Sequence, residues 1–254
     1  MPHGSPPPAP SSAALRQDHL RAFAGGVVVS CQARPGNPLH GPATMALMAQ
    51  AAELGGAVGL RVNGPEDIAA VRRATSLPIM GIWKQDHPGS AVSITPTVAS
   101  VREIVAAGAT MVALDGTARP RPGGESLADV VKEIHRLGAV ALADLATTED
   151  LRHAVLADID AVGTTLAGYT AESPATGDGP DFELLRWLVR HSPVPVFAEG
   201  RYWAPEQVTE AFGIGAAFVV VGTAITNPMA ITARFVASAR AVSTPPEQSD
   251  AHPA

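Results

Sequence analysis

The sequence predicts an α/β protein folded as a single (β/α)8 barrel, and three observations support this prediction. Short apolar runs alternate along the chain with longer segments of helical periodicity, a pattern typical of parallel strands joined by helices. The apolar runs are nearly continuous, so we expect both faces of each strand to be buried. About eight such units follow one another without a break in composition, and that number favours a closed barrel over an open sheet.

The predicted strands are the apolar runs, and a helix is expected after each of them. The strands span residues 25–32, 57–62, 78–84, 111–115, 139–144, 161–165, 195–201 and 218–221. The helices span residues 42–54, 65–74, 98–107, 126–137, 149–156, 181–190, 205–212 and 228–239. Pro65 suits a first helical turn and Asp181 a helix cap. An open dinucleotide-binding sheet would need Gly-x-Gly-x-x-Gly after its first strand, and residues 32–38 do not match it.

The bulk composition suits one domain of this size. The chain has 254 residues, of which 46% are hydrophobic and 17% charged, enough to build a large core. We expect a disordered Pro/Ser-rich extension at residues 1–19, the barrel at 20–240 and a disordered tail at 241–254.

Composition also excludes several classes of function. A net charge of −6 gives no electrostatic footprint for nucleic acid. No apolar run approaches the roughly 18 residues of a membrane span, and the N-terminus lacks the features of a signal peptide. A single cysteine, Cys31, suits the cytoplasm and is expected to be a buried core residue. The eight histidines show no metal-ligand spacing, so no metal is expected.

Polar residues gather where the predicted strands end, at one mouth of the barrel, where active sites of this fold lie. They are Gln32, Arg61, Lys84, Asp115, Asp144 and Glu199. Asp115 also begins an Asp-Gly-Thr sequence that is typical of a turn.

Lys84 and Glu199 end the third and seventh strands, which face each other across a ring of eight. A carbon held between them could lose a proton on one face and regain it on the other. The pKa of Lys84 should be lowered by Arg61 and by removal from water, whereas the direction for Glu199 stays open. Lys84 could alternatively form a Schiff base, as in a class I aldolase, which borohydride trapping would detect.

A phosphate site is predicted after the last two strands, at Gly200, Arg201, Gly222 and Thr223. Glycines let backbone N–H groups approach an anion, and a helix N-terminus beyond them adds a favourable dipole.

Seven motifs, in this order and spacing, resemble those of the N-acetylmannosamine-6-phosphate 2-epimerase family. They are Ser-Cys-Gln-Ala at 30–33, Gly-Leu-Arg-Val-Asn-Gly at 59–64, Pro-Ile-Met-Gly-Ile-Trp-Lys at 78–84, Leu-Asp-Gly-Thr at 114–117, Ala-Asp-Leu-Ala-Thr at 143–147, Gly-Thr-Thr-Leu-Ala-Gly-Tyr-Thr at 163–170 and Ala-Glu-Gly-Arg at 198–201. The resemblance covers residues 20–237. It implies a TIM barrel that converts N-acetylmannosamine 6-phosphate to N-acetylglucosamine 6-phosphate in amino-sugar and sialic acid breakdown, without a nucleotide or metal, and it makes a homodimer plausible.

The resemblance also implies roles for individual residues. Lys84 and Glu199 match the catalytic lysine and glutamate. Gln32, Arg61 and Asp144 match residues that hold the sugar, and Gly200, Arg201, Gly222 and Thr223 fall where the phosphate is bound. Asn227 stands where the family usually has a substrate-holding arginine, and Arg201 is a candidate to compensate.

The resulting hypothesis is epimerisation beside the aldehyde of a ring-opened N-acyl hexosamine 6-phosphate. Lys84 or Glu199 removes the proton, Lys84 and Arg61 stabilise the enolate oxygen, and reprotonation comes from the other face. Two rival hypotheses stay open: the class I aldolase, and a catalytically inactive protein that binds and senses a sugar phosphate.

Overall fold

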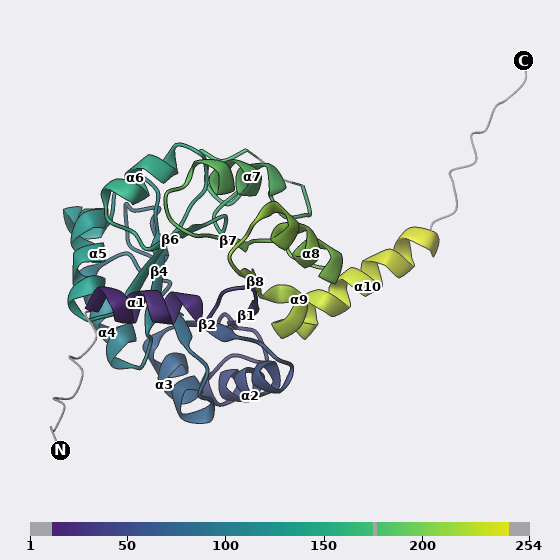
Figure 1. The fold of residues 1–254 in the computed structure, drawn as a ribbon. Helices are drawn as coiled ribbons and strands as arrows, with labels where there is room; N and C mark the ends of the chain where they lie inside the picture. The colour runs from purple at the N-terminus through teal and green to yellow at the C-terminus, as the bar shows by residue number, and fades with distance from the viewer. Residues whose placement is uncertain (1–11, 175–176, 244–254) are drawn as a thin grey trace, which may run out of the picture.

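Eight parallel strands close into a barrel in which each strand pairs with its neighbours in chain order (Figure 1). The structure is a computed structural model that describes residues 12–174 and 177–243. The strands are β1 (Val27–Cys31), β2 (Gly59–Asn63), β3 (Ile79–Ile82), β4 (Met111–Asp115), β5 (Val140–Asp144), β6 (Ala161–Gly163), β7 (Val196–Glu199) and β8 (Val219–Val221). The pairing of β8 with β1 closes the ring, so the predicted (β/α)8 barrel is confirmed.

Helices surround the barrel and follow the strands as predicted. They are α2 (Pro42–Leu54), α3 (Pro65–Ala74), α4 (Val98–Ala106), α5 (Leu127–Arg136), α6 (Asp150–Leu156), α7 (Phe182–His191), α8 (Pro205–Ile214) and α10 (Pro228–Ser243). Asp181 caps α7, because its Oδ1 accepts a hydrogen bond from the backbone N–H of Leu184 at 2.9 Å. Two short elements were not predicted from the sequence: a 3-10 turn η1 (Pro122–Gly124) and the short helix α9 (Thr223–Thr226).

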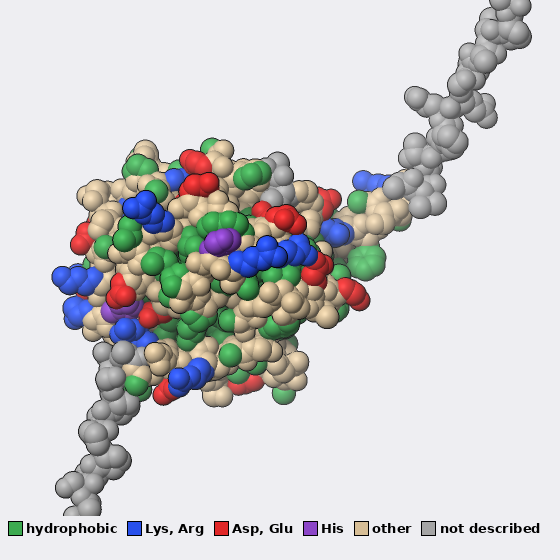
Figure 2. Space-filling view, turned by 45° about the horizontal axis from the view of Figure 1, so that its top comes forward, with side chains coloured by type: hydrophobic (Ala, Val, Ile, Leu, Met, Phe, Trp, Pro, Cys, Tyr) green, Lys and Arg blue, Asp and Glu red, His purple; other side chains and the backbone are tan. Residues whose placement is uncertain are grey.

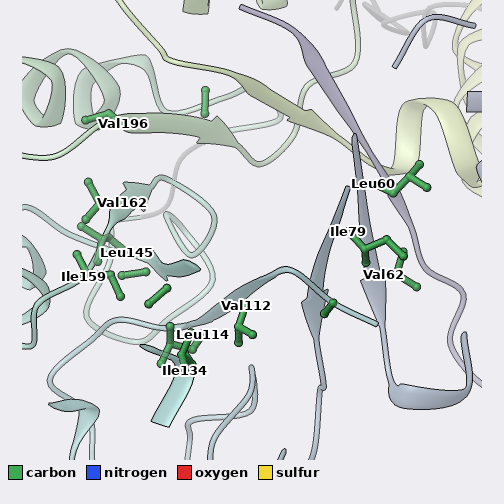
Figure 3. Close-up of a cluster of buried hydrophobic side chains, with 14 of the residues drawn as sticks. Leu60, Val62, Ile79, Val112, Leu114, Ile134, Leu145, Ile159, Val162 and Val196 are labelled. Carbon is green, nitrogen blue, oxygen red and sulfur yellow. The ribbon is translucent and has the colours of Figure 1, made fainter. Parts of the chain in front are cut away.

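Apolar side chains pack on both faces of the sheet, as the continuous apolar runs predict. One set fills the space between the strands and the helices, including Leu60, Ile79 and Val162 (Figure 3). The other fills the interior of the barrel, including Met80, Leu142 and Phe197. Cys31 is fully buried in the first set, as predicted, and its burial raises the pKa of the thiol to about 12.

A helix that the sequence analysis did not predict lies across the barrel beside β5 (Figure 1). This is α1 (Ser12–Arg21), so the predicted disorder of residues 1–19 is wrong for residues 12–19, and residues 1–11 lie outside the described residues. Arg16 Nε lies 3.4 Å from Asp160 Oδ1, and Leu20 packs against the interior core. These tertiary contacts stabilise a helix whose own apolar periodicity is weak.

The C-terminal helix α10 projects from the body of the barrel (Figures 1 and 2). It continues to Ser243, so the predicted tail at 241–254 is helical at 241–243, and its remainder lies outside the described residues. Phe235 on this helix is 74% exposed and Met229 is 58% exposed. On the face drawn in Figure 2, cationic and anionic side chains are interspersed. Within the described ranges, no helix is long and apolar enough to cross a membrane.

Candidate functional site

Three of the predicted site residues form one buried ion-pair cluster inside the mouth of the barrel. Arg61 on β2 donates from Nη2 to Asp144 Oδ2 at 2.7 Å and from Nη1 to Asp144 Oδ1 at 3.0 Å. Nη1 also donates to Glu199 Oε2 at 2.6 Å. The side chains of Arg61 and Asp144 are almost fully buried, and that of Glu199 is 13% exposed. Arg61 therefore bridges two carboxylates through Nη1 and Nη2, while its Nε is buried without a hydrogen-bond partner among the described residues.

Glu199, the last residue of β7, has a pKa raised to about 7. Burial is the main cause because it disfavours the charged carboxylate. The positive charges of Arg61 and Lys84 act in the opposite direction, and the negative charge of Asp144 adds to the rise. The direction that the sequence left open is therefore set by desolvation, and it brings the pKa of the carboxyl group close to neutral pH.

Lys84 follows β3 and opens a hairpin over the mouth. It forms an antiparallel bridge with Ile94, and its backbone N–H donates to Asn63 Oδ1 at 2.9 Å. Although the residue as a whole is exposed, its amine lies within the mouth, against Gln32. Desolvation of the amine, followed by the positive charge of Arg61, lowers the pKa of Lys84 to about 8. This confirms the predicted direction.

Gln32, after β1, connects Lys84 to the barrel wall. Lys84 Nζ donates to Gln32 Oε1 at 2.8 Å, and Gln32 Nε2 donates to Ser30 Oγ at 2.6 Å. The amide thus fixes the amine from one side. Sequence reasoning placed Gln32 in the site but gave no sign that Ser30 would orient it.

Two neighbouring threonines after β6 contact Glu199, and sequence reasoning singled out neither of them. Thr164 Oγ1 donates to the backbone carbonyl of Glu199 at 2.8 Å and accepts from its N–H at 3.1 Å. Thr165 Oγ1 lies 2.6 Å from Asp144 Oδ1 and 3.2 Å from Glu199 Oε2. Two signals were available: their place at the end of a predicted strand, and their inclusion in the motif at residues 163–170.

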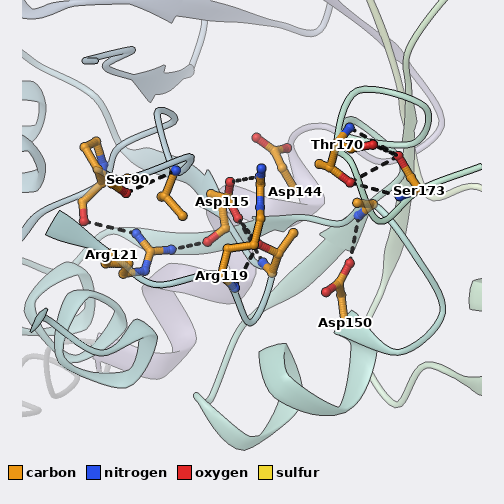
Figure 4. A network of polar contacts seen from close by, with 12 residues as sticks. Ser90, Asp115, Arg119, Arg121, Asp144, Asp150, Thr170 and Ser173 are labelled. Carbon is orange, nitrogen blue, oxygen red and sulfur yellow. Dashed lines mark hydrogen bonds and ion pairs between the residues drawn. The ribbon is translucent and has the colours of Figure 1, made fainter. Parts of the chain in front are cut away.

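Asp115 ends β4 but belongs to a separate polar network among the loops (Figure 4). Its Oδ1 accepts from Thr117, and its Oδ2 lies 2.6 Å from Arg119 Nη2, which confirms the turn interpretation. Arg121, which sequence reasoning also missed, donates to the backbone carbonyls of Asp115, Thr95 and Pro96. It thereby joins the Lys84 hairpin to the end of β4.

Gly200 and Arg201 form the turn after β7. Gly200 has a φ of 114°, a conformation that favours glycine. Arg201 Nε donates to Gly179 O at 2.8 Å and Nη1 to Ala167 O at 2.9 Å, and its guanidinium lies 4.9 Å from the ring centroid of Tyr169. Arg201 therefore ties the turn after β7 to the loop after β6.

The turn after β8 packs closely on β1. A Cβ at Gly222 would lie 3.2 Å from Ser30 Cβ, so little room exists for a side chain. Thr223 begins α9, directly after Gly222. Asn227 caps the next helix, because its Oδ1 accepts from the N–H of Ala230 at 3.2 Å. Asn227 stands where the family resemblance leads us to expect an arginine, and its side chain instead caps the helix that follows.

The arrangement places two titratable groups at opposite strands of one closed ring, Lys84 just after β3 and Glu199 at the end of β7. Their pKa values, about 8 for Lys84 and about 7 for Glu199, are close to each other and to neutrality. Such groups can both donate and accept protons at physiological pH. In the part of the chain that the structure describes, no three His, Cys, Asp or Glu side chains gather as metal ligands.

Comparisons with known proteins show the family to which the chain belongs. Residues 45–241 match a family model described as putative N-acetylmannosamine-6-phosphate epimerase. A putative N-acetylmannosamine-6-phosphate 2-epimerase of Cutibacterium acnes is 48% identical over 219 residues, covering 85% of this chain and 94% of that protein. One from Caldanaerobacter subterraneus subsp. tengcongensis is 45% identical over 224 residues, covering 87% of this chain and 94% of that protein.

Solved structures give the same result. The N-acetylmannosamine-6-phosphate 2-epimerase of Clostridium perfringens superposes with a TM-score of 0.84 at 42% identity, covering 86% of this chain and 95% of that chain. FabK of Thermotoga maritima superposes with a TM-score of 0.58 at 18% identity, covering 83% of this chain and 65% of that chain. The second likeness concerns the fold alone.

Proposed function

We propose that this chain, which belongs to the family of putative N-acetylmannosamine-6-phosphate epimerases, interconverts N-acetylmannosamine 6-phosphate and N-acetylglucosamine 6-phosphate. The observation that carries the proposal is the opposition of Lys84 and Glu199 across one mouth, with pKa values of about 8 and about 7. Inversion at a carbon requires that a proton leave one face and return to the other, and this pair supplies a group for each face.

The chemistry begins with the open-chain form of the sugar, whose aldehyde acidifies the C–H bond at the carbon bearing the acetamido group. The base, either Glu199 as carboxylate or Lys84 as amine, takes that proton, and the bonding pair moves into an enolate. The other residue, in its protonated form, returns a proton to the opposite face. In the reverse direction the two residues exchange roles, so each must be able to hold and release a proton near neutral pH.

The remaining polar residues have supporting roles in the proposal. Gln32 holds the Lys84 amine at 2.8 Å and is placed to contact the sugar. Arg61 holds the Glu199 carboxyl group and is itself held by Asp144, so we assign Arg61 to positioning that group. Lys84, as the cation nearer the open mouth, is the better candidate to stabilise the enolate oxygen.

The turns after β7 and β8 supply the proposed phosphate site. The backbone N–H groups of Gly200 and Gly222 are the proposed phosphate donors, and Thr223 adds a hydroxyl at the start of α9. Arg201 supports the site by fixing the turn after β7 through Ala167 O and Gly179 O. The loss of the family arginine at Asn227 makes these backbone donors more important.

We further propose a cytoplasmic homodimer. A single cysteine suits a reducing compartment. The exposed apolar side chains of α9 and α10 favour a second copy as partner: Ile225 is 49% exposed, Met229 58%, Phe235 74% and Val236 43%.

The family match favours epimerisation over the aldolase and the inactive sensor. Proton NMR of the purified protein with N-acetylmannosamine 6-phosphate in deuterated water tests the proposal. We expect the glucosamine epimer to appear with deuterium at the inverted carbon. A substrate that neither converts nor exchanges hydrogen with solvent would refute it.

A further inference from the structure

The Thr165 hydroxyl lies between two carboxylates that differ in their bonding. Its Oγ1 is 2.6 Å from Asp144 Oδ1 and 3.2 Å from Glu199 Oε2. A hydroxyl has one hydrogen to donate, so Thr165 serves one carboxylate at a time. The contact with Asp144 is the shorter, and rotation of the hydroxyl hydrogen directs it to Glu199 instead.

The two carboxyl oxygens of Glu199 are therefore not equivalent. Oε2 receives Arg61 Nη1 at 2.6 Å and faces Thr165. Within the described residues, Oε1 has no hydrogen-bond partner. It is not among the fully buried polar atoms without a partner, so part of its surface is accessible. Oε1 is thus the oxygen that reaches the accessible part of the mouth.

We propose that Thr165 is a positioning residue for proton transfer, which with Arg61 fixes Oε2 of Glu199 so that Oε1 exchanges the proton with substrate. The inference rests on the proposed function, because it assumes that Glu199 is one of the two proton-exchanging groups. It assigns the side-chain hydroxyl of Thr165 a role distinct from that of Thr164, whose hydroxyl contacts Glu199 through the main chain, at its carbonyl and its N–H.

The proposal fixes the direction of the effect on pH dependence. The charged groups that face Glu199 are Arg61 from β2, Lys84 from the end of β3 and Asp144 from β5. A donor on Oε2 stabilises the ionised carboxylate. When the hydroxyl is removed, the two neighbouring carboxylates share one donor fewer. Asp144 keeps two hydrogen bonds from Arg61 and stays ionised. The loss of the donor therefore favours the protonated form of Glu199, and the pKa of Glu199 rises.

Four proteins test this in the deuterium-exchange NMR assay across pH: wild type, Thr165→Val, Thr165→Ser and Thr164→Val. Thr165→Val keeps the shape of the side chain without its hydroxyl. We expect its kcat to fall about tenfold, the scale for one hydrogen bond to a charged group, with little change in KM. We also expect the pKa assigned to Glu199 to move above that of wild type. Thr165→Ser should restore both quantities, and Thr164→Val should lower the melting temperature without moving this pKa.

A second readout is independent of turnover. The carboxyl ¹³C resonance of Glu199, assigned by comparison with Glu199→Gln, should titrate at higher pH in Thr165→Val than in wild type. An unchanged titration and kcat would overturn the inference, as would an effect confined to KM or an equal defect in Thr165→Ser. If Thr165→Val and Thr165→Ala both fail to fold while Thr165→Ser folds, the hydroxyl serves folding and the inference also falls. Inactivity of wild type would instead refute the proposed function.

Discussion

Nη1 of Arg61 lies 2.6 Å from Oε2 of Glu199, and both side chains are largely withdrawn from solvent, with 1% and 13% of their surfaces exposed. The positive charge of Arg61 does not keep the pKa of Glu199 low, because burial has the larger effect and raises that pKa to about 7. Desolvation and charge pairing together leave a carboxyl group that is held in place and still able to exchange a proton near neutral pH.

Variants of Glu199 and of Lys84 should each lose hydrogen exchange with a different one of the two epimers. Glu199→Gln and Lys84→Gln are each expected to lower the rate of conversion by on the order of 10³, the range for a lost general acid or base. Each variant keeps one base, so each should still exchange hydrogen with solvent in one epimer only. NMR in deuterated water measures this. Lys132→Gln, on the exposed face of α5, is the control. Exchange of the same epimer by both variants would contradict the two-base arrangement.

The dependence of kcat/KM on pH should be bell-shaped. Epimerisation in either direction needs one proton on the Lys84–Glu199 pair. Below about pH 7 both groups carry a proton, and above about pH 8 neither does. We therefore expect kcat/KM to be greatest between these values and to fall on both sides, with apparent pKa values that belong to the pair. Initial rates measured from acid to alkaline pH check this, and a flat profile would exclude the pair as the titrating groups.

Removal of Arg61 should destabilise the barrel. Arg61→Met leaves Asp144 and Glu199 buried together without their cation, which is expected to reduce the free energy of unfolding by about 3–5 kcal/mol. Urea denaturation measures the change. Arg102→Met is the matched control, because Arg102 contacts Glu133 at the same 2.6 Å but is 60% exposed. Its loss should cost less than about 1 kcal/mol. Equal losses for both variants would show that burial does not matter here.

A methyl group at Gly200 should distort the proposed phosphate turn. Gly200 has a φ of 114°, so Gly200→Ala is expected to cost about 1–3 kcal/mol of stability and to raise KM for the phosphorylated sugar. Gly213→Ala is the control: Gly213 lies in α8 with open space around it, where alanine should stabilise by about 0.5–1 kcal/mol. Urea denaturation and initial rates test both, and a harmless Gly200→Ala would argue against a constrained turn.

The sequence was informative wherever a local pattern determines structure. Continuous apolar runs predicted the eight strands, and the order of polar residues at their ends predicted that Arg61, Lys84, Asp144 and Glu199 would share one mouth. Helix α1 was missed because its stability comes from contacts such as that of Arg16 with Asp160, 144 positions later in the chain. Local periodicity carries no information on such contacts.

The bonding within the site was also beyond the sequence. That Arg61 would bind two carboxylates depends on how β2 lies against β5 and β7 across the barrel. The direction of the Glu199 pKa depends on how far burial exceeds the nearby positive charges, and that requires coordinates. Thr165 was overlooked for a related reason: a threonine at the end of a β-strand is common, and only its distances to Asp144 and Glu199 distinguish it.

The two groups that would exchange protons with substrate belong to parts of the molecule with different freedom to evolve. Glu199 ends a strand of the closed barrel, so a change in its place would disturb the whole ring. Lys84 opens a hairpin that is joined by a bridge to Ile94 and is held at its end by Arg121, which donates to the carbonyl of Thr95. Changes in the length or sequence of that hairpin would move the Lys84 amine while leaving the Glu199 carboxyl group in place. New substrates would therefore be easier to reach, by selection or by design, from the lysine side.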